Sequence, residues 1–158
     1  MDSGFRPEIS DTADPQDQSD LQEALFAFNR QATGYSDGRA LSCFLRDEDG
    51  RLVAGLDGFT WGGYARVEYV WVDEPSRGRG LGHALMTAAI SEAAARGCVT
   101  MVLDTHTFQA PRFYERLGFT EVGRTLDTPV GHDQILYQRR LLPSPSTSSG
   151  EPPQQPAP

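Results

Sequence analysis

Arg77-Gly78-Arg79-Gly80-Leu81-Gly82 is a glycine-rich turn between an extended apolar run and a helical run. The run before it, Val67-Glu68-Tyr69-Val70-Trp71-Val72, has the β-branched and aromatic composition of a strand, and residues 81–96 read as a helix. A turn of this kind directs free backbone N–H groups at one point, where the helix dipole also favours negative charge. With two arginines beside it, the stretch predicts a phosphate or pyrophosphate site.

The kind of phosphate site can be narrowed by exclusion. All fourteen basic residues are arginine, whereas a P-loop needs a lysine directly after its last glycine. The spacing Gly78-x-Gly80-x-Gly82 differs from the G-x-G-x-x-G pattern of dinucleotide folds, and the helix comes too late in the chain for their opening unit. The absence of lysine also excludes Schiff-base chemistry and a pyridoxal phosphate anchor.

Two motifs together resemble a known family. Arg77-x-x-Gly80-x-Gly82 between a strand and a helix resembles the acetyl-CoA pyrophosphate loop of the GNAT acetyltransferases. Downstream, Ala110-Pro111-Arg112-Phe113-Tyr114-Glu115-Arg116-Leu117-Gly118-Phe119 is similar to that family's second signature, a short helix that carries a tyrosine and ends in Gly-Phe. The signatures have the expected order and spacing, which makes the resemblance much more specific than either motif alone.

The predicted elements form an α/β (α+β) arrangement that begins with antiparallel strands. The resemblance implies the GNAT fold, a central mixed sheet of six to seven strands flanked by about four helices. It also implies that strands 66–72 and 98–104 splay apart to admit the pantetheine arm of the cofactor. We expect strands at residues 5–9, 41–46, 52–61, 66–72, 98–104 and 134–138, and helices at residues 19–32, 81–96 and 111–117.

The 158 residues allow one folded domain. Residues 1–20 form an acidic segment that includes the predicted first strand, and residues 5–142 are expected to be the N-acetyltransferase domain. Residues 143–158 are rich in proline and serine and lack an apolar residue that could anchor them in a core, so we expect a disordered tail.

The charge of the chain bears on its partners. The net charge of −8 lies mostly in residues 1–20, since residues 21–142 carry 15 acids against 13 arginines. Without a basic stripe, nucleic-acid binding is disfavoured. No apolar run reaches the length of a membrane span and residues 1–4 do not resemble a signal peptide, so we expect a cytoplasmic protein without a membrane partner.

The resemblance assigns the cosubstrate acetyl-CoA to the loop and the strand before it. Backbone N–H groups of the turn would hold the pyrophosphate, and Arg77 or Arg79 would add charge; the alternative for these arginines is a solvated surface position. Backbone groups of Val70, Trp71 and Val72 would lie along pantetheine, while their side chains pack as an ordinary strand. The complete predicted set of cofactor-binding residues is Val70, Trp71, Val72, Arg77, Gly78, Arg79, Gly80, Leu81, Gly82, His83, Thr107 and Arg112.

Acyl transfer from a thioester to an amine requires a base, a stabilised oxyanion and an acid for the departing thiolate. By resemblance, Tyr114 is the general acid; the alternative is a core aromatic, a role that suits Phe113 better. Glu68 stands where several family members carry a carboxylate proposed as base, although strand alternation leaves its face open. His106 is a second candidate base. A backbone N–H of the strand, at Val70 or Trp71, would stabilise the oxyanion.

One position departs from the family pattern. Thr107 stands seven residues before Tyr114, where the family usually has an asparagine that contacts pantetheine. A threonine hydroxyl can make only one of the two contacts, and Gln109 is an alternative source of the amide. The three histidines, His83, His106 and His132, are too scattered to predict a metal site.

The sequence therefore predicts an N-acetyltransferase that moves acetyl directly from acetyl-CoA to a primary amine of a small molecule, in a ternary complex. The alternative is a CoA-binding sensor or scaffold module with degenerate chemistry. Variable segments at residues 26–38, 58–63 and 125–132 are expected to build the acceptor pocket, and they would also fit a homodimer interface. The identity of the amine is left open.

Overall fold

A computed structural model describes residue 4 and residues 6–141, which fall into two units, Met1–Ser36 and Asp37–Pro158. Phe5 and the predicted tail at residues 143–158 lie outside the described residues. Each unit is considered by itself.

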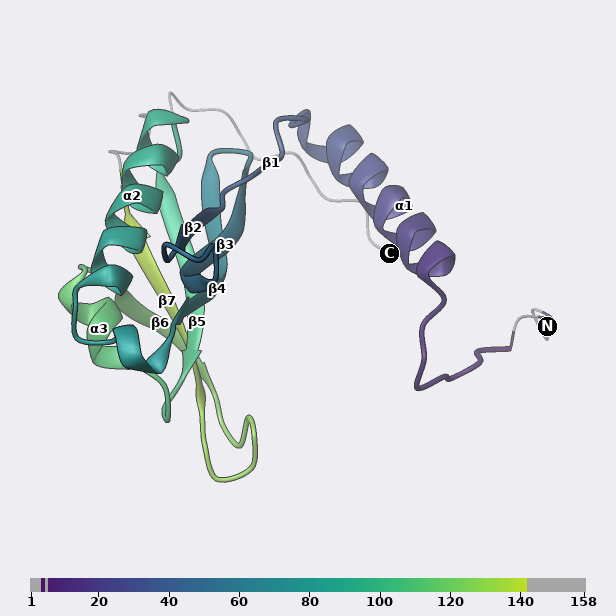
Figure 1. Cartoon of the computed structure of the whole chain (residues 1–158). Helices are drawn as coiled ribbons and strands as arrows, with labels where there is room; N and C mark the ends of the chain where they lie inside the picture. The colour runs from purple at the N-terminus through teal and green to yellow at the C-terminus, as the bar shows by residue number, and fades with distance from the viewer. Residues whose placement is uncertain (1–3, 5, 142–158) are drawn as a thin grey trace. The chain divides into compact units, whose positions relative to one another are not determined.

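The first unit contains one helix, α1 (Pro15–Thr33) (Figure 1). Asp14 caps its start by accepting a hydrogen bond from the backbone N–H of Gln16 (2.7 Å), and Gly34 ends it in the left-handed conformation. The predicted end is confirmed, but the helix begins at Pro15 rather than Ser19. The apolar periodicity that indicates this helix starts only at Leu21. A prediction based on it therefore misses the first turn, which is made of polar residues.

The predicted first strand at residues 5–9 is wrong over its described part, because Arg6 to Ile9 form no strand and are exposed. A strand needs a partner for its backbone groups, and Pro7 has no N–H to offer. The apolar residues of α1 do recur at helical spacing, yet Leu21, Leu25 and Phe28 are all exposed. No helix in the described part of the chain is both long and apolar enough to cross a membrane.

The second unit is built on a seven-stranded mixed sheet, as predicted, with the order β1-β3-β4-β5-β7-β6 and β2 paired to β3. Every pair is antiparallel except β4 with β5. About four helices were expected; the described residues form three α-helices and one 3₁₀ turn, a difference in number and not in kind. The elements of this unit are β1 (Arg39–Ala40), β2 (Cys43–Arg46), β3 (Leu52–Trp61), β4 (Tyr64–Val72), η1 (Glu74–Ser76), α2 (Leu81–Ala95), β5 (Thr100–His106), α3 (Pro111–Arg116), β6 (Thr120–Thr125) and β7 (Gln134–Arg140).

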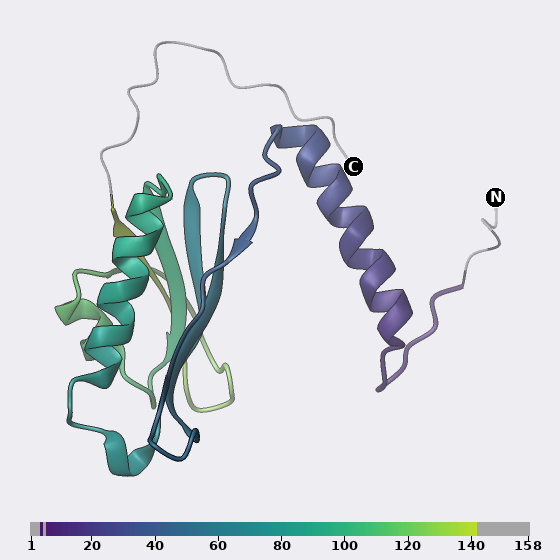
Figure 2. The ribbon, with the colours of Figure 1, turned by 45° about the horizontal axis from the view of Figure 1, so that its top comes forward.

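One face of the sheet forms the core, and both α2 and α3 lie on it (Figures 1 and 2). Buried residues alternate with less buried ones along β5, where Met101, Leu103 and Thr105 point inward. From α2, Leu85 packs into the same core cluster. Burial of a leucine side chain of this kind stabilises the fold by about 2 kcal/mol.

A β-bulge at Glu68 divides β4 into two parts. Asp57 pairs with Tyr69 and Gly58 pairs with Val67, so Glu68 has no partner in β3. The bulge reverses the alternation of side chains, because Val67 is buried whereas Tyr69 is 70% exposed. Gly58 is required opposite the bulge, since a Cβ there would collide with the backbone of Arg66.

Beyond the bulge, β4 and β5 separate. Their parallel pairing covers residues 64–67 of β4 and 100–103 of β5 and then stops, although β4 continues to Val72 and β5 to His106. A bulge increases the local bend of a strand, which accounts for the point of divergence. The predicted splay of the two central strands is therefore confirmed.

Candidate active site

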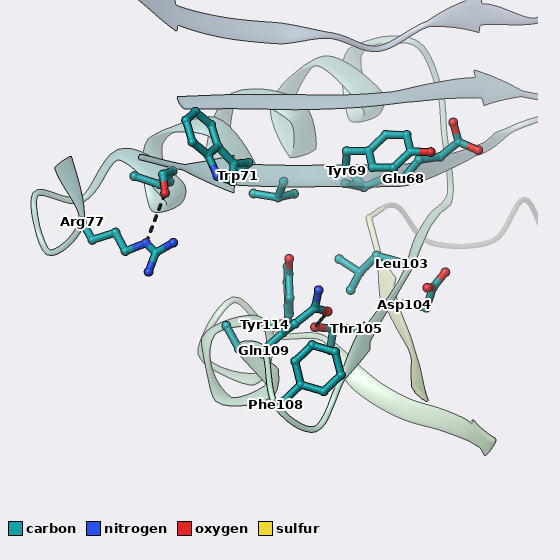
Figure 3. A pocket seen from close by; sticks show the side chains of 14 residues that line it. Glu68, Tyr69, Trp71, Arg77, Leu103, Asp104, Thr105, Phe108, Gln109 and Tyr114 are labelled. Carbon is teal, nitrogen blue, oxygen red and sulfur yellow. Dashed lines mark hydrogen bonds between the residues drawn. The ribbon is translucent and has the colours of Figure 1, made fainter. Parts of the chain in front are cut away.

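A cleft of about 700 Å³ occupies the space between the diverging halves of β4 and β5. Residues 67–72 of β4 form one wall, the end of β5 forms the other, and Tyr114 of α3 closes it from the core side. Figure 3 shows the Tyr114 hydroxyl directed into the gap toward β4, with Gln109 and Phe108 beside it. Arg77 lines the end of the cleft next to the glycine loop.

Tyr114 is both a core residue and a cleft residue. Only 9% of its surface is exposed, and its ring packs against Phe113, Phe119 and Tyr137 with centroid distances of 5.0, 6.2 and 6.3 Å. Burial raises the pKa of its hydroxyl, and the negative charge of Asp104 raises that pKa further. The phenol therefore stays protonated at neutral pH, which is the state that a general acid requires.

Glu68 reaches the cleft because of the bulge. Its side chain is exposed and lines the cleft wall, and Figure 3 shows its carboxylate pointing away from the Tyr114 hydroxyl. Simple alternation along β4 could not have assigned this face, since the bulge interrupts the alternation at this residue. An exposed carboxylate that lines the same cleft as Tyr114 can accept a proton through water.

Two residues of the glycine loop adopt the left-handed backbone conformation. Gly78 and Gly80 have φ angles of 73° and 79°, in the left-handed region that favours glycine. Gly80 precedes α2 and offers no side-chain cap, so the N–H groups of the first turn, from Leu81 to His83, have no side-chain acceptor at this cap. Arg77 donates from Nε to the carbonyl of Val72 (3.2 Å), which ties the loop to the end of β4.

Gly82 has a packing role in addition to its place in the loop. A Cβ at this position would lie 3.4 Å from the ring of Phe113 and 3.8 Å from Val72. These are ordinary van der Waals distances, so a Cβ fits, whereas a larger side chain would press on Phe113 and Val72. Neither Gly82 nor the other residues from Gly78 to Leu81 line the cleft itself; they follow Arg77 beyond its end.

Apart from the loop residues Gly78 to Gly82, three further predicted cofactor residues lie outside the cleft lining. His83 lines a separate hollow beside α2 together with Arg116 and Arg139, and Arg112 is exposed on α3. Thr107 is exposed and bonds to Asp133, donating its N–H (2.9 Å) and accepting the Asp133 N–H on its hydroxyl (3.2 Å). These hydrogen bonds hold the loop after β5 against the start of β7.

Gln109 lines the cleft, whereas Thr107 does not. Its Oε1 accepts hydrogen bonds from the hydroxyl of Thr105 (3.0 Å) and the backbone N–H of His106 (2.9 Å). Because these bonds fix the amide, Nε2 is left facing the cleft (Figure 3). His106 lies 3.2 Å from the same oxygen through Nδ1 and stacks on Phe108, and it does not line the cleft.

We predict that Gln109→Glu weakens CoA binding by about 3- to 10-fold, the loss of one hydrogen bond. Glutamate can still accept the bonds from Thr105 and His106 but has no N–H to donate, so the melting temperature should change little. Titration calorimetry with CoA measures the effect. As a control, Thr107→Val should leave CoA affinity unchanged; a larger effect of Thr107→Val than of Gln109→Glu would show that the hydroxyl makes the contact.

Asp104 is a cleft residue that the sequence does not single out. It accepts hydrogen bonds from Nη2 of Arg66 and Nε2 of Gln134, both at 2.6 Å, just beyond the last paired residues of β4 and β5. The sequence offers one indication of this role, namely that Asp104 is an acidic residue at the end of an apolar strand. Within the described residues, no group of three or more His, Cys, Asp or Glu side chains is arranged to hold a metal ion.

A mixed sheet that opens between two parallel neighbours, with a glycine loop at one end and a protonated tyrosine in the opening, is the arrangement of the GNAT class of acetyltransferases. Comparison with known proteins agrees: the model of the Acetyltransferase (GNAT) family matches residues 6–119. The chain therefore belongs to the GNAT family.

Individual relatives agree with this assignment. Acetyltransferase Atu2258 of Agrobacterium fabrum is 37% identical over 133 residues, which cover 84% of this chain and 97% of the relative. Blasticidin-S acetyltransferase of Streptomyces morookaense is 40% identical over 97 residues, 60% of this chain and 70% of the relative. The crystal structure of a presumed acetyltransferase from Agrobacterium tumefaciens superposes with a TM-score of 0.81 at 33% identity, covering 86% of this chain and 99% of the other.

Proposed function

We propose that the protein transfers acetyl from acetyl-CoA directly to a primary amine of a small molecule, within a ternary complex. The observation that carries this proposal is the position of the protonated Tyr114 hydroxyl inside the cleft between β4 and β5. The glycine loop at the end of this cleft suits a pyrophosphate, and the Nε2 of Gln109 suits an amide carbonyl of pantetheine. When bound, acetyl-CoA would supply the acetyl group as a thioester.

The residues of the cleft can serve each step of such a transfer. Glu68 accepts the proton of the substrate ammonium through water, which leaves a neutral amine to attack the carbonyl carbon. A backbone N–H of Val70 or Trp71 stabilises the oxygen that becomes negative as the C–N bond forms. Tyr114 donates its proton to the sulfur as the C–S bond breaks, and the second proton of the attacking nitrogen passes through water to the Tyr114 oxygen, so that an amide and a free thiol leave the site.

A small-molecule acceptor is supported by the relatives. The blasticidin-S acetyltransferase that resembles this chain is named for a small-molecule substrate. The cleft is also open to solvent at Glu68 and Tyr69, both of which are exposed. Neither the name of this relative nor the exposure of Glu68 and Tyr69 requires a polypeptide acceptor.

Thiol release from acetyl-CoA with a panel of primary amines tests the proposal. We expect turnover with at least one amine, and we expect Glu68→Gln to lower kcat at neutral pH by about 100-fold, with a smaller loss at alkaline pH, where the amine is already neutral. Binding of CoA without turnover on any amine would instead support the sensor or scaffold module.

The expected homodimer is also part of the proposal. Apolar side chains of α1 and of the segment after it, including Leu21, Phe28 and Tyr35, are exposed in the described unit and would be covered by association. Sedimentation equilibrium should give twice the chain mass; a monomer at micromolar concentration would contradict it.

A further inference from the structure

A second hollow, of about 350 Å³, adjoins the cleft at Asp104, which lines both. Its polar walls come from Arg66, Asp104, Arg124, Thr125 and Gln134. These side chains lie on the face of the sheet opposite the core, because Arg66 alternates with the buried Ala65 and Val67, and Gln134 precedes the buried Ile135. The hollow therefore opens on the side of the sheet that α2 and α3 leave uncovered.

The charged side chains that line the cleft differ from those that line this hollow. Away from Arg77 at the loop end, the charged side chains of the cleft are the carboxylates of Glu68 and Asp104. The hollow instead carries two guanidinium groups, those of Arg66 and Arg124, and shares only Asp104 with the cleft. Because Arg124 is paired with Glu121 and Asp133, Arg66 is the group that attracts a negative end. A ligand that spans both spaces is therefore stabilised with its positive end beside Glu68 and its negative end at Arg66.

The two arginines differ in how many of their N–H groups are free to donate a hydrogen bond to a ligand. Arg124 uses all three of its nitrogens, donating from Nε and Nη2 to Glu121 (both 2.9 Å) and from Nη1 to Asp133 (3.0 Å). Arg66 is 33% exposed and donates only from Nη2, to Asp104. Within residues 6–141, its Nε and Nη1 meet no acceptor, so its fork of N–H groups can bind an oxyanion.

Asp104 holds this guanidinium in place. One of its oxygens accepts from Arg66 and the other from Gln134, so the carboxylate is fixed from β4 and β7 at the same time. Its charge also repels an oxyanion from the cleft wall that it lines. The acceptor is thereby oriented, since the reverse placement would bring like charges together.

We propose that the hollow binds an oxyanion of the acceptor through Arg66, so that the substrate is a primary amine that also carries a carboxylate or phosphate group. This inference rests on the proposed acetyl transfer, whose amine end lies in the cleft beside Glu68. It narrows the acceptor to a class and assigns Arg66 as the residue that selects it.

Matched acceptors test the inference. The ω-amino acids from glycine to aminohexanoate are compared with amino alcohols of the same length, and phosphoethanolamine with ethanolamine, by kcat/KM. We expect the wild type to prefer the oxyanion member by about 10- to 100-fold at the chain length that spans the two spaces, the effect of one charge-assisted contact. Arg66→Gln should abolish the preference while largely sparing the neutral member.

Two further variants make the result specific. Arg66→Gln/Asp104→Asn leaves no unpaired carboxylate and should lose the preference as well. Arg46→Gln removes an exposed arginine on β2 whose guanidinium bonds only the carbonyl of Gly50 (3.1 Å), and it should keep the preference. The carboxylate and phosphate series show which oxyanion fits better. No preference in the wild type, or an equal loss for both members in Arg66→Gln, would overturn the inference.

Calorimetric titration of the same acceptor pairs into CoA-loaded protein separates this inference from the proposed reaction. If no amine is acetylated but the oxyanion members bind more tightly through Arg66, the proposed transfer fails and the oxyanion site stands. If amines are acetylated and bound without regard to their oxyanion, the transfer stands and the oxyanion site is rejected.

Discussion

Replacing Tyr114 by phenylalanine should lower kcat by about 100-fold and leave the dissociation constant of CoA unchanged. A positioned general acid contributes about 100-fold or more to the rate, and the phenyl ring keeps the contacts with Phe113, Phe119 and Tyr137 that hold α3 on the sheet. The expected loss corresponds to about 2.7 kcal/mol of transition-state stabilisation. Steady-state kinetics on an accepted amine and calorimetry with CoA measure the two effects.

Tyr137→Phe is the matched control, because it removes the same hydroxyl from a neighbouring buried ring. Tyr137 donates to Glu115 (2.8 Å) on the side of α3, and its loss should lower stability by about 1 kcal/mol with kcat intact. If Tyr114→Phe retained full turnover, or if Tyr137→Phe lowered kcat equally, the assignment of Tyr114 as the acid would fail.

The pH dependence follows from the direction of the pKa shift. Burial and the charge of Asp104 raise the pKa of Tyr114 above the usual 10.0, so the acid stays protonated throughout the neutral range. Deprotonation of Tyr114 should therefore limit kcat only above pH 10. The same shift stabilises the fold fully below pH 10, and that contribution is lost as the pH rises through the raised pKa.

Gly80→Val should raise the dissociation constant of acetyl-CoA by about 100-fold. Gly80 has a φ of 79°, a conformation that strains a residue with a Cβ by about 1–2 kcal/mol and a β-branched one further. Relief of this strain turns the N–H groups of the loop and of the first turn of α2 away from their common point. Loss of two charge-assisted hydrogen bonds accounts for the expected change.

Gly97→Val separates strain from ligand binding. Gly97 has a φ of 82° and, like Gly80, no heavy atom within 4 Å of a Cβ built on it, but it lies after the other end of α2. Both variants should lower the melting temperature similarly, and only Gly80→Val should lose CoA affinity. Equal loss of affinity in both would mean that the effect comes from a general weakening of α2.

The features that could be predicted are those encoded by short stretches. The glycine turn, the helix α2 that follows it, and β3 were expected close to their observed bounds, because glycine conformation, helical spacing and strand composition are local properties. The splay was implied by family resemblance. The first turn of α1 and the false strand at residues 5–9 show the limit: apolar pattern is a weak guide where few apolar residues are present.

The candidate site likewise contains some features that local motifs predict and others that depend on the tertiary structure. Tyr114 and the loop were recognisable as motifs, but the face of Glu68 depended on a bulge, and a bulge arises from the register between two strands. Asp104 became a cleft residue only because the pairing of β5 with β4 ends at Leu103. Thr107 was expected at the cofactor by its distance from Tyr114, whereas the loop turns it toward Asp133 and brings Gln109 to the cleft.

The amino-acid sequence was sufficient to identify a glycine-rich turn, a tyrosine signature and, through them, the family of the chain. Each of the two motifs consists of consecutive residues, whose backbone preferences act locally. The tertiary structure was needed to show which side chains meet. It places the amide of Gln109 at the cleft and the carboxylate of Asp104 between the cleft and the hollow, and it leaves N–H groups of Arg66 free to donate. Those relations join residues far apart in the chain, and they follow from strand register and packing, which no local pattern encodes.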